Sequence, residues 1–136
     1  MRYAALLSLL ALLSLAQCGL ASQEPPASSA LSEEAARQRA IEVAAMGGPE
    51  IEAAEAAPQI RAITRTTWQE AQAGEGDLPS ISGREPTLEV WVVELAGEWS
   101  GGMPAPEITP TPARFTSAVI VLDARTGETI TTIYRP

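Results

Sequence analysis

The chain of 136 residues contains no histidine, no lysine and a single cysteine. Without an imidazole or an amine, it lacks the commonest general base of enzymes and the nucleophile that forms Schiff bases. One cysteine cannot form an internal disulfide or supply the thiolates of a cysteine-rich zinc site. Catalysis by a carboxylate pair stays open in principle, but the spacing of the glutamates singles out no pair. We therefore expect that this protein is not an enzyme, and we assign no catalytic residue.

Positive charge is scarce as well. Nine arginines supply all of it, against 17 acidic residues, and the formal net charge is −8. A protein that binds nucleic acid needs a basic surface, so we expect no nucleic-acid partner. Only two aspartates occur, Asp77 and Asp123, and they form no closely spaced ligand run of the kind that holds calcium. We expect no metal and no cofactor.

Residues 1–17 have the pattern of a signal peptide. Arg2 gives a short basic start, and residues 3–16 are almost entirely apolar. Fourteen residues would form a helix of roughly 21 Å, which is short for a hydrocarbon core of about 30 Å. We therefore leave this segment out of the fold.

The end of the apolar run resembles a bacterial lipobox, in which a cysteine becomes the lipidated first residue of the mature chain. Leu15, Ala16 and Cys18 match this pattern, and Gln17 does not. Residues 18–31, rich in proline and serine, are typical of a flexible tether. We expect Cys18 to be the lipidation site of an extracytoplasmic, membrane-anchored protein. The alternatives are plain secretion, with cleavage after Ala16 or Ala21, and an uncleaved N-terminal anchor.

A helix is expected at the start of the remaining domain, residues 32–136. Ser32 can cap it, two glutamates follow in its first turn, and the pair Gly47-Gly48 ends it. Pro49 and the many alanines and glutamates after it predict a short second helix over 49–57, which Pro58 would end. The expected apolar stripe of the first helix consists of Leu31, Ala35, Ile41 and Ala44 or Ala45.

Four strands are expected after the helical segments. Alternating apolar and β-branched residues indicate strands over 59–70, 87–95, 114–122 and 128–134, with Trp68 on the Ile60 face of the first. The second is apolar on both faces, so it should lie centrally, and residues 96–99 either continue it or turn. The resulting class is α+β, with the N-terminal helix packed on a four-stranded antiparallel sheet. One helix can cover only one face, so the other face must be polar, packed by loops or offered to a partner.

The last two strands are joined by a segment with a strong turn signal. Asp123 can accept hydrogen bonds from turn N–H groups, and Gly127 can adopt the left-handed conformation that closes a hairpin. We therefore expect these two residues to be structural. Two loops rich in glycine and proline, residues 74–86 and 100–112, interrupt the rest of the sheet.

This arrangement resembles the PepSY domain family, small extracytoplasmic domains of bacterial envelope proteins and of secreted peptidase propeptides. The closing segment is similar to the family's Val-Asp-Ala-x-Thr-Gly-Glu hairpin. The resemblance implies a domain that binds and restrains a secreted or periplasmic peptidase. This chain contains no peptidase of its own, so such a role would act on a separate protein. The matching segments are 32–35 and 39–44 in the helix, 88–93 in the middle strand and 121–128 in the hairpin.

The candidate partner-binding residues are Trp99 and Met103, at the start of the loop over 100–112. Aromatic and methionine side chains are enriched at protein interfaces. The alternative for Trp99 is that it folds back as a lid on the uncovered face of the sheet. The sequence thus predicts a non-catalytic lipoprotein with a PepSY-like domain that binds a protein partner. The alternative is a structural or sensory envelope module with no inhibitory activity.

Overall fold

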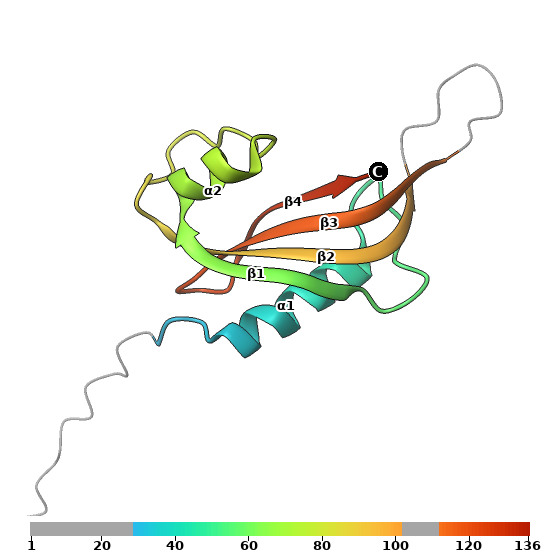
Figure 1. Ribbon diagram of the computed structural model, residues 1–136, viewed down its shortest axis with the longest axis horizontal. Helices are drawn as coiled ribbons and strands as arrows, with labels where there is room; N and C mark the ends of the chain where they lie inside the picture. The colour runs from blue at the N-terminus through green and yellow to red at the C-terminus, as the bar shows by residue number, and fades with distance from the viewer. Residues whose placement is uncertain (1–28, 102–111) are drawn as a thin grey trace, which may run out of the picture.

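The structure, a computed structural model, describes residues 29–101 and 112–136. Within these ranges, two helices and four strands form an α+β fold, and the sheet has the order β1-β2-β3-β4 with every neighbouring pair antiparallel. Figure 1 shows α1 crossing one face of the sheet and α2 lying on the opposite side. The expected fold class is confirmed. The elements are α1 (Glu33–Met46), β1 (Gln59–Thr67), α2 (Trp68–Glu75), β2 (Glu89–Gly101), β3 (Ala113–Asp123) and β4 (Thr129–Arg135).

Helix α1 starts as expected and approaches the sheet through alanines. The Ser32 side chain accepts a hydrogen bond from the Ala35 N–H at 3.2 Å, which caps the first turn. Three alanines spaced four residues apart, Ala36, Ala40 and Ala44, are fully buried. Their small side chains let the helix backbone lie close to the strands. Ala35, expected in this stripe, is exposed instead.

Strand β2 lies between β1 and β3, as its two apolar faces predict. Trp91, Val93 and Leu95 belong to the core beneath α1, whereas Val90 and Val92 belong to a second core on the α2 side. A register shift between Ala96 and Trp99 marks a bulge, after which β2 continues to Gly101. The strand is therefore longer than the expected 87–95.

The first strand ends earlier than expected, because α2 begins at Trp68. The Thr67 hydroxyl accepts from the Glu70 N–H at 3.3 Å, and the Glu70 carboxylate accepts from the Thr67 N–H at 3.3 Å. This reciprocal capping box starts a helix where the sequence predicted strand over 59–70. Trp68 is consequently buried in the core of the α2 side, whereas Ile60 packs against the α1 side. The prediction that they share a face was wrong.

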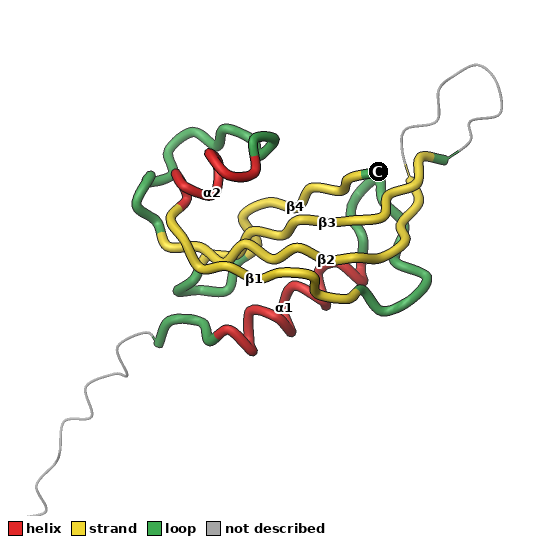
Figure 2. Tube along the Cα trace, viewed as in Figure 1, coloured by secondary structure: helices red, strands yellow, loops and turns green. Residues whose placement is uncertain are grey.

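The short helix expected over 49–57 is also absent, since this described segment is a turn and an extended connection (Figure 2). Ile51 forms isolated bridges with Gly48 and with Gly101 at the end of β2. The Glu52 N–H donates to the Ser100 carbonyl at 2.8 Å. A side chain at Gly101 would collide with the Glu50 carbonyl oxygen, so glycine permits this close approach. Pairing with the sheet outweighs the helix propensity of the alanines and glutamates.

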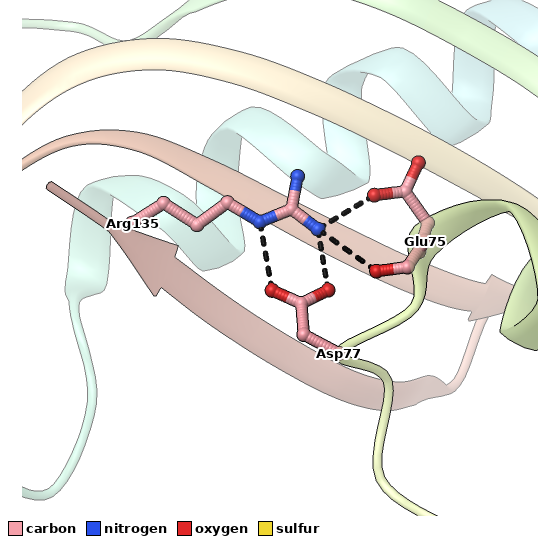
Figure 3. A network of polar contacts seen from close by, with 3 residues as sticks. All are labelled: Glu75, Asp77 and Arg135. Carbon is pink, nitrogen blue, oxygen red and sulfur yellow. Dashed lines mark hydrogen bonds and ion pairs between the residues drawn. The ribbon is translucent and has the colours of Figure 1, made fainter.

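Arg135, on the edge strand β4, connects the C-terminal end of α2 to the sheet (Figure 3). Arg135 on β4 donates to both carboxylate oxygens of Asp77, at 2.9 and 2.6 Å, and to the Glu75 carboxylate at 2.7 Å. The hydrogen bonds from Arg135 lower the pKa of the Asp77 carboxyl, and the two acids raise the pKa of Arg135. The network holds the C-terminal end of α2 over the sheet.

Candidate functional site

The hairpin turn between β3 and β4 is built by the two residues that the sequence singled out. One carboxylate oxygen of Asp123 accepts from the N–H groups of Arg125 and Thr126, at 2.8 and 3.0 Å. Gly127 has φ 73°, the left-handed conformation that glycine tolerates best. Burial opposes ionisation of Asp123, but the two backbone donors outweigh it and lower the pKa of the carboxyl. Asp123 and Gly127 therefore both take part in closing this turn.

Two tryptophans on β2 hold the two ends of α1. The Trp91 indole N–H donates to the Leu31 carbonyl at 3.0 Å, just before the helix. The Trp99 indole N–H donates to the Ala44 carbonyl at 2.8 Å, in its last turn. The backbone N–H of Leu31 also donates to the Ala124 carbonyl, so the chain enters the domain beside the hairpin turn. The helix is thus fixed along the direction of β2.

These contacts correct the expectation for Trp99. Only 2% of its surface is exposed, and it packs in the core beneath α1. It therefore cannot offer its ring to a partner in this conformation, and the lid over the opposite face is wrong as well. Met103 lies outside the described residues, as do Cys18, the signal peptide and most of the tether.

A groove lined in part by Trp99 lies at the end of the domain where α1 ends. It has a volume of about 400 Å³. The half-buried ring of Phe115 lies in it and packs against Tyr134, with ring centroids 6.1 Å apart. Tyr134 packs edge-on against Trp99, at 5.4 Å. The principal lining residues are Glu52, Glu55, Glu98, Trp99, Arg114 and Phe115. We call these six residues the end groove.

The end groove combines an aromatic floor with a mainly acidic rim. Glu55, Glu98 and Arg114 are exposed around it, and Glu52 is fixed there because its carboxylate accepts from the Ser100 hydroxyl at 2.7 Å. Three carboxylates against one guanidinium give the groove negative charge. Such a surface attracts a partner that carries positive charge.

The residues of the end groove come from segments far apart in the sequence. Of these residues, only Trp99 could be proposed as a binding residue from the sequence. Glu52 belongs to the connection after α1, Glu98 to β2 past its bulge, and Phe115 to β3. They meet because Ile51 pairs with the end of β2. The two glycines and four prolines of the loop over 100–112 gave the only sequence signal that this end of the domain is irregular.

Neither a metal centre nor a membrane-spanning helix is found among residues 29–101 and 112–136. No three histidine, cysteine, aspartate or glutamate side chains in these ranges are grouped so that they could hold a metal ion. Neither α1 nor α2, the helices described there, has the length and apolarity needed to cross a membrane.

Comparison with known proteins gave no relative. No protein-family model matches the chain, and searches of curated proteins and of solved structures found no match either. The site must therefore be interpreted from its own chemistry.

Proposed function

We propose that this chain is a non-catalytic, lipid-anchored extracytoplasmic protein whose domain binds a protein partner at the end groove. The partner class implied by the PepSY resemblance is a secreted or periplasmic peptidase, which the domain would restrain. The lipid would be carried by Cys18, and the signal peptide would direct export. The fold and the groove support this proposal, and the resemblance and the lipobox motivate it.

The observation that carries the proposal is the placement of the end groove relative to the tether. The tether enters at Leu31, which is bound to Ala124 beside the hairpin turn. The end groove lies beside Trp99, eight residues further along β2 than Trp91, or roughly 26 Å in an extended strand. Figure 1 shows the chain entering at one end of the sheet and β2 and β3 reaching their far tips at the other. In a domain tethered in this way, the groove lies at the end opposite the point of attachment.

The chemistry of the groove specifies what the partner should present. The exposed part of Phe115 favours an apolar side chain, and the carboxylates of Glu52, Glu55 and Glu98 favour arginine or lysine beside it. We therefore propose a partner surface with a basic residue next to an apolar one. Because the rim charges are exposed, we expect them to act on association rate and salt dependence more than on residence time.

Capture with matched charge variants tests the partner site. The chain is used to capture proteins from its native envelope extract, with Glu98→Lys and Glu128→Lys as variants. Both change the charge equally, but Glu128 lies next to the hairpin turn at the tether end. We expect one protein that wild type and Glu128→Lys retain and Glu98→Lys loses. Equal retention by all three would contradict the groove. If the protein retained is a membrane sensor rather than a peptidase, the alternative of a sensory module is favoured.

The anchor has a separate test. The mature protein is isolated from membranes, and the mass of its N-terminal peptide is measured. We expect a diacylglyceryl-modified Cys18 at the first position and loss of membrane association in Cys18→Ser. An unmodified Cys18, or a chain that begins at Ser22, would overturn the lipoprotein proposal.

A further inference from the structure

The outer edge of β4 has few of the features that usually prevent edge strands from pairing. Among the described residues, β4 closes the sheet and has β3 as its only strand neighbour. From Thr131 to Tyr134 it carries no charge, no proline and no glycine. The register shift opposite Ile130 disturbs only its beginning and leaves Thr131 to Arg135 regular. Such an edge offers unpaired N–H and C=O groups to another strand.

The opposite edge, β1, is protected by comparison. A register shift between Ile60 and Ala62 distorts it, and the exposed Arg61 lies within that irregularity. Bulges and charges are two of the ways in which proteins block edge pairing. On β4 the single charge, Arg135, is already bound by Glu75 and Asp77. The edge that stays open to pairing is therefore β4.

We propose that β4 pairs antiparallel with β4 of a second copy of this chain, with Ile133 at the two-fold axis. Opposite residues of an antiparallel pair point to the same face, which fixes which registers are allowed. With Ile133 opposite itself, Thr132 lies opposite Tyr134 and Thr131 opposite Arg135. Neither pair brings like charges together, and the Ile133 pair adds an apolar contact on the α2 side.

The space around β4 permits this arrangement. In the described residues α1 packs on β1, β2 and β3 but not on β4, so no helix blocks the approach from that face. On the other face, Arg135 is drawn inward to α2 (Figure 3). Five residue pairs bury much less than the roughly 1,600 Å² of a standard interface. We therefore expect a weak dimer, with a dissociation constant above about 1 μM.

Sedimentation equilibrium of the purified chain tests self-association. The unlipidated Cys18→Ser chain is measured up to about 500 μM, a range chosen for the weak affinity expected of a small interface. Thr131→Lys would face Arg135 of the second copy twice across the axis, and Thr64→Lys places the same charge on β1. We expect a concentration-dependent dimer that Thr131→Lys weakens about tenfold and Thr64→Lys leaves unchanged. A chain that stays monomeric throughout this range overturns the proposal.

Disulfide trapping in the same Cys18→Ser background tests the register. Opposite residues of an antiparallel pair lie close enough for a disulfide. Ile133→Cys should therefore oxidise to a covalent dimer, whereas Ile63→Cys on β1 should not. A dimer that is trapped by Ile63→Cys and not by Ile133→Cys would place the interface on the wrong edge and overturn the proposal. Both measurements use purified protein, so they are independent of whether a peptidase is bound.

Discussion

The indole N–H of Trp99 and the carbonyl oxygen of Ala44 are joined by a hydrogen bond of 2.8 Å. The bond links β2 beyond its bulge to the last turn of α1, where the Ala44 carbonyl also accepts from the capping Gly47 N–H at 3.3 Å. The bond holds the Trp99 ring in the core beneath the end groove, where the ring also packs against Tyr134. The stability of the groove should therefore depend on this one indole.

A first prediction concerns the ring of Trp99 itself. Trp99→Phe removes the donor to Ala44 and leaves part of a buried site empty, so we expect the free energy of unfolding to fall by about 2 kcal/mol. Trp91→Phe removes the matching bond to Leu31 at the other end of α1, and it should have a smaller effect because that bond is only partly buried. Urea unfolding of both variants provides the measurement. A Trp91→Phe variant that is the less stable of the two would contradict the greater importance of Trp99.

A second prediction uses two glycines that should respond in opposite directions. A side chain at Gly97 would collide with the Trp99 ring, so we expect Gly97→Ala to destabilise the domain by about 2 kcal/mol. Gly74 lies in α2 with open space around it, and Gly74→Ala should stabilise the domain by up to about 1 kcal/mol. Thermal unfolding of both variants gives the comparison. If both variants change the midpoint of thermal unfolding in the same direction, the close contact between Gly97 and the Trp99 ring is contradicted.

A third prediction concerns acid. The pKa of Asp123 is lower in the folded chain than in the unfolded chain, so its ionised form stabilises the fold at neutral pH. This contribution is complete above the ordinary aspartate pKa of about 3.9 and is lost as pH falls through the lower pKa of the folded state. Asp123→Asn keeps an oxygen acceptor but cannot ionise. We expect the free energy of unfolding of wild type to decline more steeply than that of Asp123→Asn below about pH 4. Parallel pH profiles would contradict the turn geometry as the source of the shift.

A fourth prediction concerns the attachment of α2. Arg135→Gln removes both ion pairs, to Glu75 and Asp77, which are partly exposed. Exposed pairs contribute little to global stability, so we expect a loss below about 1 kcal/mol. The local effect should be larger, with faster amide hydrogen exchange in α2 and unchanged exchange in α1. Arg125→Gln, on the exposed hairpin turn, is the control. Uniform acceleration across both helices would show a global rather than a local role for Arg135.

The sequence predicts those parts of the fold that are determined by local signals. Ser32 and Gly47 mark the ends of α1, and the Asp123–Gly127 segment carries its own turn chemistry. The two apolar faces of β2 place it centrally. At the helix ends and in the turn, neighbours in the sequence make the decisive contacts, whereas β2 is recognised from its own run of apolar residues.

Other parts depend on contacts between distant segments. The alanines and glutamates of residues 49–57 favour a helix, but pairing of Ile51 with Gly101 extends the chain instead. The end groove cannot be predicted for the same reason, since it joins three separate segments. The strand expected over residues 68–70, where α2 begins, is wrong for a different reason. Thr67 and Glu70 have the spacing of a capping box, a local signal that competes with the strand-like alternation before it.

The central claim, that the domain binds a protein through its end groove, is tested most directly by site-specific photo-crosslinking in intact cells. A photoreactive amino acid replaces Glu98 in the end groove or, as the control, Glu34 in the first turn of α1 near the tether. Both positions are exposed, so neither substitution should disturb the core. Our account predicts a crosslinked product with one defined protein from position 98 and none from position 34. No product at position 98, or the same products at both positions, would contradict it.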